Sequence, residues 1–154
     1  MTITFPRRSE NFKIRPCRRN DFAAVVELLR QLWPDRNLDT AALRKVYERG
    51  LRAKSQVYLS ASDANNVRGF VSLIIKNNLW QAANVGNIDE LVVDEKHRGR
   101  GLGTQLLNEI IARASQRGCV RLELDSAFHR NSAHEFYQRQ DFEKRAYLFS
   151  KGLS

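Results

Sequence analysis

The chain has 154 residues, of which 42% are apolar and 28% are charged, and its formal net charge is +9. That length suits one domain with a hydrophobic core, and the composition excludes wholesale disorder. The chain has no apolar run of the ~20 residues that span a bilayer and no secretory signal pattern at residues 1–8, so we expect a cytoplasmic protein that does not enter a membrane.

The apolar spacing and the turn residues predict a strand-rich chain with several helices. Residues 1–10 are expected to form a loose tail and residues 11–154 a single domain. In chain order, the expected elements are a strand at 12–16, a helix from the cap Asn20 to Trp33–Pro34, a helix beginning at Asp39 or Thr40, strands at 56–60 and 69–75, a loop at 76–84, a strand at 85–93, a helix from 102 to the cap Gly118, a strand at 120–124, a helix at 131–138 and one or two strands within 142–151.

The stretch between residues 85 and 124 is a strand, a helix and a second strand in succession. A connection of this kind joins two parallel strands, so the sheet is expected to be mixed. The fold class is therefore α/β or α+β.

Three alternate glycines, Gly99, Gly101 and Gly103, stand between a predicted strand and a predicted amphipathic helix. Glycine permits a positive φ and close approach of the backbone to a ligand, and the start of a helix attracts anions. Arg98 and Arg100 add positive charge. The spacing matches neither a P-loop nor a dinucleotide-binding loop. From these residues alone, a phosphate site and a plain structural turn fit equally well.

The loop resembles the signature Q/R-x-x-G-x-G/A of the GNAT superfamily of N-acetyltransferases, which Arg98-x-x-Gly101-x-Gly103 matches in full. The similarity covers residues 11–153 and includes 14–16, 90–93, Asn131 and 134–137. Within the superfamily, residues 86–93, 133–137 and 149–153 resemble aminoalkylphosphonate and other small-amine N-acetyltransferases. Asp141 departs from the family, which often has a glycine there, but Asp tolerates the left-handed conformation.

This resemblance implies a mixed, mostly antiparallel sheet of six to seven strands flanked by about four helices, with acetyl-CoA as co-substrate. It assigns cofactor binding to the backbone of Leu91, Val92 and Val93, to the loop residues Arg98, Gly99, Arg100, Gly101, Leu102, Gly103 and Thr104, and to Asn131. An N-cap role for Asn131 is the alternative. No metal is predicted, because the cysteines and histidines lack ligand spacing.

Two residues are candidates for proton transfer. Glu90 interrupts an apolar strand, and the resemblance makes it the general base that deprotonates the amine, directly or through water. Tyr137 matches the family's general acid, which protonates the departing thiolate. The competing interpretations are a structural salt bridge for Glu90 and a core aromatic for Tyr137.

The predicted substrate wall contains Trp33, Asp35 and Trp80 within a mixture of charges, which favours a small amine, zwitterionic or phosphonate-bearing. Acetylation of a protein lysine or N-terminus and a non-catalytic acyl-CoA-binding module are the alternatives. A nucleic-acid partner is not expected, because no dense basic run accompanies the +9 charge. A homodimer is compatible with the sequence, but no feature requires it.

Overall fold

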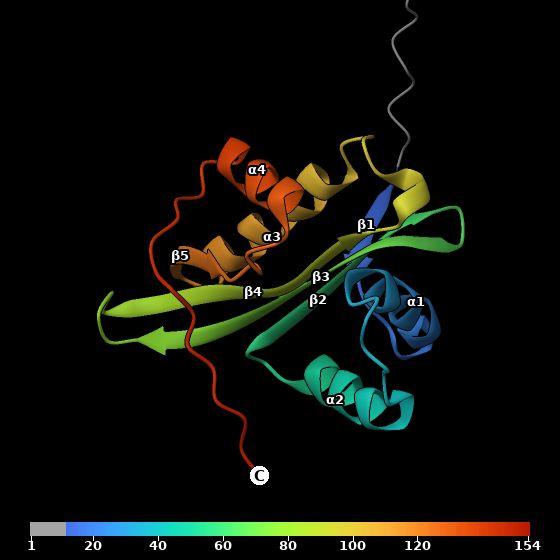
Figure 1. Cartoon of the computed structure of the whole chain (residues 1–154), viewed down its shortest axis with the longest axis horizontal. Coiled ribbons are helices and arrows are strands. Elements are labelled where there is room, and N and C mark those ends of the chain that lie inside the picture. The colour runs from blue at the N-terminus through green and yellow to red at the C-terminus, as the bar shows by residue number, and fades with distance from the viewer. Residues whose placement is uncertain (1–11) are drawn as a thin grey trace, which may run out of the picture. The chain divides into compact units, whose positions relative to one another are not determined.

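The computed structural model describes residues 12–154, so the expected tail at residues 1–10 lies outside the described part (Figure 1). The described chain forms two compact units, one ending at Glu123 and the other spanning Leu124–Ser154. Its elements are β1 (Lys13–Pro16), a 3₁₀ turn (Arg19–Asp21), α1 (Phe22–Leu32), α2 (Thr40–Arg52), β2 (Gln56–Asp63), β3 (Asn66–Asn78), β4 (Ala83–Val93), a second 3₁₀ turn (Glu95–His97), α3 (Leu102–Gln116), β5 (Cys119–Leu124) and α4 (Asn131–Arg139).

The sheet has the strand order β1-β2-β3-β4-β5. The first four strands pair antiparallel with their neighbours, and β5 reaches the side of β4 through the α3 crossover. This mixed α/β arrangement confirms the predicted class. The implied six to seven strands are wrong for the described chain, which has five.

The missing strands were expected within residues 142–151, where the structure has no regular element. The side chains of Tyr147, Leu148 and Phe149 there are 75%, 70% and 90% exposed. A segment becomes a strand only when its backbone hydrogen-bonds to the edge of a neighbouring strand. Alternating polar and apolar side chains predicted strands here, but alternation does not show whether such an edge is present.

Helices cover both faces of the sheet in the first unit, with α1 and α2 on one face and α3 on the other (Figure 1). The helix α3 buries Leu102, Leu106, Leu107 and Ile110 to 1% exposure or less. Two predicted helix signals are confirmed: Trp33 follows α1, and the Asp39 side chain accepts from the Ala42 N–H at 3.0 Å at the start of α2. The expected cap Asn20 is wrong, because Asn20 lies within the first 3₁₀ turn and Asp21 is the N-cap of α1. None of the helices within residues 12–154 has the length and apolarity to cross a bilayer.

The segment 76–84, expected as a loop, is the end of a hairpin instead. The strand β3 continues to Asn78 and β4 begins at Ala83, so the turn is only four residues long. Backbone pairing extends beyond the apolar core because a ladder of hydrogen bonds does not require buried side chains. Trp80 lies in this turn and is 86% exposed.

The second unit contains α4 and the turn that follows it. Asp141 has φ +65° there, which confirms that aspartate adopts the left-handed conformation where the related family often has glycine. The turn brings the Tyr137 ring within 5.6 Å of the Phe142 ring, centroid to centroid, and Phe136 lies at 5.4 Å. Tyr137 is therefore half-buried among aromatic rings.

Candidate active site

A β-bulge in β4 sets the direction of Glu90. Ser72 of β3 pairs with Glu90, but the next residue, Leu73, pairs with Ile88, so Asp89 has no partner in the ladder. Paired residues share a face of the sheet. Glu90 therefore shares the face of Ser72, where α1 and α2 pack, whereas Ile88 shares the opposite face with Leu73.

Ser72 holds Glu90 through two hydrogen bonds. Its hydroxyl accepts from the Glu90 N–H at 3.0 Å and donates to the Glu90 carboxylate. Ser72 is 2% exposed, so this contact lies at the bottom of the site. Ser72 was not among the residues predicted from the sequence, although a lone serine within the apolar run of β3 is a signal that could have found it.

Glu90 lines an aromatic pocket of about 70 Å³. It is lined by residues of α1, α2, β2 and β3 and by the residue after α1: Phe22, Val25, Leu29, Trp33, Leu43, Val46, Tyr47, Tyr58 and Phe70. Four of the rings form a continuous row, with centroid distances of 5.4 to 5.7 Å from Phe22 through Tyr47 and Tyr58 to Phe70. A carboxylate among aromatic faces attracts an ammonium group.

The two tyrosine hydroxyls of this pocket are engaged with other groups. Tyr47 donates to the Arg18 carbonyl at 2.7 Å, and Tyr58 donates to Gln56 Oε1 at 2.8 Å. Burial, reinforced by the negative charge of Glu90, raises the pKa of Tyr58 to about 12. Tyr58 therefore stays neutral at ordinary assay pH, and Glu90 is the acidic side chain in the described pocket lining.

The glycine loop has two left-handed glycines beside the start of α3. Gly99 and Gly101 have φ of +76° and +80°, and a Cβ placed on either meets no described atom within 4 Å. Gly101 is the N-cap of α3 and offers no side-chain oxygen to the first-turn N–H groups. The Arg98 guanidinium anchors the loop by donating to the Val93 carbonyl at 3.0 Å. Open space over the two glycines and the start of a helix are features that favour an anion.

The remaining predicted residues lie in several places. Trp33 lines the Glu90 pocket, whereas Asp35 is exposed between α1 and α2 and Trp80 is exposed at the hairpin turn; neither of these two contributes to the described lining. Tyr137 and Asn131 belong to the second unit. Asn131 is the first residue of α4 and Arg130 is its N-cap, so the alternative capping role for Asn131 is wrong.

Removing the Ser72 hydroxyl is expected to change the pH dependence of the acetyl transfer that the resemblance implies, in which Glu90 is the expected base. A hydrogen bond to a carboxylate favours its charged form, so Ser72→Ala should move the acidic limb of the kcat/KM profile up by about one pH unit. Ser60→Ala is the matched control, because Ser60 is equally buried in β2. An unchanged acidic limb in a folded Ser72→Ala variant would exclude this role for Ser72.

Comparison with known proteins identifies the chain's relatives. Residues 22–142 match the model of the acetyltransferase (GNAT) family. The aminoalkylphosphonate N-acetyltransferase of Salmonella typhimurium is 33% identical over 132 residues, which cover 86% of this chain and 82% of that protein. Glucosamine 6-phosphate N-acetyltransferase 1 of Oryza sativa subsp. japonica is 31% identical over 119 residues, covering 73% and 72%.

A solved structure agrees with this relationship. A Trypanosoma brucei acetyltransferase superimposes with a TM-score of 0.77 at 25% identity and covers 93% of this chain and 100% of that one. The family match, the two named relatives and the glycine loop are all consistent with acetyl transfer from acetyl-CoA. The chain belongs to the GNAT family of acetyltransferases and is an acetyl-CoA-dependent N-acetyltransferase.

Proposed function

We propose that this enzyme acetylates the primary amine of a small molecule by direct attack, with Glu90 as the general base and Tyr137 as the general acid. The main support is the position of Glu90, whose carboxylate is held by Ser72 in an aromatic pocket. The amine nitrogen bonds to the acetyl carbon as the carbon–sulfur bond breaks. Glu90 takes the amine proton, directly or through water, and Tyr137 gives a proton to the departing sulfur.

The cofactor-binding part of the proposal assigns the diphosphate of acetyl-CoA to the backbone N–H groups of residues 98–104. The open space over Gly99 and Gly101 supports this assignment, because a ligand there would meet backbone donors at the start of α3. The backbone of residues 91–93 would bind the pantetheine arm and the developing oxyanion. The bulge at Asp89, which interrupts the hydrogen-bond ladder two residues before this segment, supports this assignment. Asn131 would bind the same arm.

Replacing Tyr137 by phenylalanine should lower kcat about tenfold to a hundredfold and leave the KM for acetyl-CoA nearly unchanged. Burial raises the pKa of Tyr137 above its ordinary value, so its hydroxyl remains protonated and able to act as an acid throughout the neutral range. Tyr147→Phe is the matched control, because Tyr147 is 75% exposed in the same unit. Equal kcat values for both variants and the wild type would remove Tyr137 from the mechanism.

The pocket supports a substrate with a compact amine arm and an anionic group outside it. Its volume of about 70 Å³ equals the space of roughly two water molecules, enough for a short aminoalkyl chain. The guanidinium of Arg44 lies over the Phe22 ring at 4.4 Å, and that of Arg36 lies over the Trp33 ring at 5.9 Å. Guanidinium groups suit phosphonate, phosphate and carboxylate. The two relatives are named for amines that carry a phosphonate and a phosphate.

A panel of amines assayed for release of free CoA thiol tests this proposal. It contains 2-aminoethylphosphonate and β-alanine, which carry an anionic group, and propylamine, which has a similar chain without one. It also includes glucosamine 6-phosphate, an aminoglycoside and a lysine peptide. We expect turnover to be highest with a short amine that bears an anion. Turnover confined to the peptide would contradict the small-molecule assignment.

A further inference from the structure

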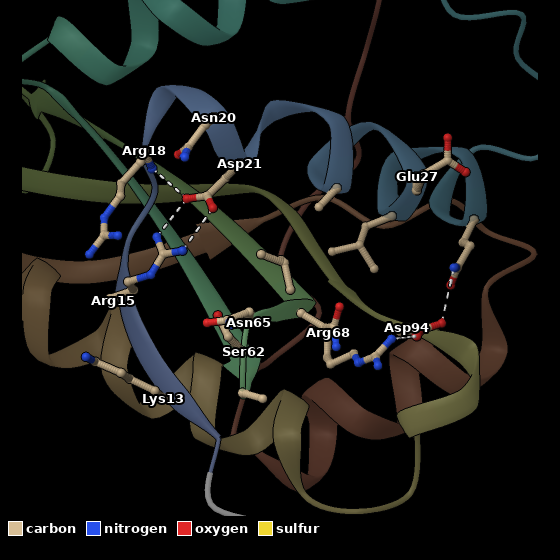
Figure 2. A pocket seen from close by; sticks show the side chains of 16 residues that line it. Lys13, Arg15, Arg18, Asn20, Asp21, Glu27, Ser62, Asn65, Arg68 and Asp94 are labelled. Atoms are coloured by element: carbon tan, nitrogen blue, oxygen red, sulfur yellow. Dashed lines mark hydrogen bonds and ion pairs between the residues drawn. The ribbon is translucent and has the colours of Figure 1, made fainter.

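A groove of the described chain lies outside the residues assigned to acetyl transfer. It has a volume of about 650 Å³ and lies between β1, the turn joining β2 to β3, and α1 (Figure 2). The helix α1 separates it from the Glu90 pocket, because the two are lined by different residues of that helix: Ala24, Glu27, Leu28 and Gln31 face the groove, whereas Phe22, Val25 and Leu29 line the pocket.

Two ion pairs occupy opposite walls of the groove (Figure 2). The Arg15 guanidinium donates to both oxygens of Asp21 at 2.7 and 2.9 Å, which holds the pKa of the Asp21 carboxyl below its usual value. On the other wall, Arg68 lies 3.5 Å from the Asp94 carboxylate and also donates to Asp63 at 3.2 Å. The Asp94 carboxylate lies 3.1 Å from His97 Nδ1 as well. Both groove acids therefore have cations beside them, and Arg68 is shared between two carboxylates.

The groove lining carries four cations, Lys13, Arg15, Arg18 and Arg68, against three acids, Asp21, Glu27 and Asp94. Among residues 12–154, Lys13 and Arg18 form no ion pair, although both line the groove. The amides of Asn20, Asn65 and Asn66 lie on the same lining. Ser62 on that lining is 7% exposed, and its hydroxyl has no hydrogen-bond partner in the described chain. The groove thus offers spare positive charge and neutral polar groups to a ligand.

We infer that this groove binds a small organic oxyanion, a phosphate- or carboxylate-bearing molecule with polar substituents, and that its occupancy weakens the binding of acetyl-CoA. Spare lysine and arginine donors favour an anion. The volume lies within the range of roughly 300–1,000 Å³ that small-molecule sites have. The anion site stands independently of the acetyltransferase reaction, while its effect on the cofactor rests on the proposed function.

The wall formed by Asp94 connects the groove to the glycine loop. The Asp94 carboxylate accepts from Gln31 Nε2 at 3.3 Å and caps the 3₁₀ turn that leads into residues 98–104. Gln31 also accepts from the Glu95 N–H at 2.9 Å. An oxyanion that draws Arg68 away from Asp94 would change the support of this turn. Coupling of this kind is reciprocal, so acetyl-CoA would weaken binding of the oxyanion by the same factor.

Calorimetric titration of the full chain with glycerol 3-phosphate and with citrate tests the site, with glycerol as the neutral control. We expect saturable binding of at least one of the two anions and none of glycerol. The variant Lys13→Gln/Arg18→Gln should bind at least tenfold more weakly. The variant Lys45→Gln/Arg49→Gln removes the same charge from α2, outside both pockets, and should bind as the wild type does.

The same titration with Gly101→Val distinguishes the groove from the glycine loop, because binding in the groove should persist in that variant. The groove site would be overturned if neither anion binds, if the two double variants lose anion affinity equally, or if Gly101→Val loses anion binding. The affinity for acetyl-CoA, measured with and without saturating anion, should fall severalfold. An unchanged affinity for acetyl-CoA would overturn the proposed coupling between the groove and the cofactor. If the chain does not bind acetyl-CoA at all, the proposed function is overturned, but the result of the anion titration remains valid.

Discussion

Replacing Glu90 by glutamine is expected to lower kcat/KM by about a hundredfold or more at pH 7. The amide keeps the shape of the side chain and one hydrogen-bonding oxygen for Ser72, but it cannot take a proton from the amine. The amine is almost entirely protonated at this pH, because an unperturbed alkylamine has a pKa of about 10.4. Steady-state measurement of thiol release at saturating acetyl-CoA gives the comparison.

The pH dependence identifies the cause of that loss. Glu90→Gln should recover much of its activity as the pH approaches 10, where the free amine becomes abundant without a base. Asp89→Asn is the matched control, because it removes the neighbouring carboxylate from the unpaired position of the bulge, where Asp89 is exposed. A uniform loss at every pH, or an equal loss in Asp89→Asn, would contradict the role of Glu90 as base.

Replacing Gly101 by valine is expected to abolish measurable binding of acetyl-CoA. Gly101 has φ +80°, a conformation that costs an ordinary residue about 1–2 kcal/mol and a β-branched residue more. The added side chain would also project into the open space above the loop, where the diphosphate is proposed to lie. Calorimetric titration with acetyl-CoA measures the effect.

Gly118→Val separates loss of the ligand site from loss of stability. Gly118 has φ +76° at the opposite end of α3, and a Cβ there also meets no described atom within 4 Å. The two variants should therefore unfold at similarly reduced temperatures, yet only Gly101→Val should lose acetyl-CoA. Normal affinity in a folded Gly101→Val variant would contradict the loop assignment.

Local signals were enough to predict most elements of the first unit. The helix α3 was predictable because its apolar residues recur at helical spacing between an N-terminal Gly101 and a C-terminal Gly118, and both glycines have the positive φ expected of them. The end of α1 followed from Pro34. Signals of this kind act within one turn of backbone, so they do not depend on the rest of the fold.

The bulge in β4 was not predictable from alternation. Ile88 and Glu90 are two residues apart, and a regular strand would place both on one face. The unpaired Asp89 separates them, so Ile88 shares the face of Leu73 and Glu90 shares the face of Ser72. The sequence identified Glu90 as an exception in an apolar run, but its partner Ser72 and its surroundings depend on the register with β3.

The aromatic pocket illustrates the same limit. Trp33, which was expected at the substrate wall, lines this pocket, whereas Phe22, Tyr47, Tyr58 and Phe70 come from four elements and meet only after the helices pack on the sheet. Trp80 was expected at the substrate wall because it was assigned to a loop, but the hairpin extends and leaves it exposed at the turn.

A crystal structure of the complex with acetyl-CoA tests the central claim most directly. We expect the diphosphate to accept hydrogen bonds of about 3 Å from backbone N–H groups within residues 98–104, at the start of α3. A diphosphate bound elsewhere on the chain, with the loop amides more than one water molecule away, would contradict the account.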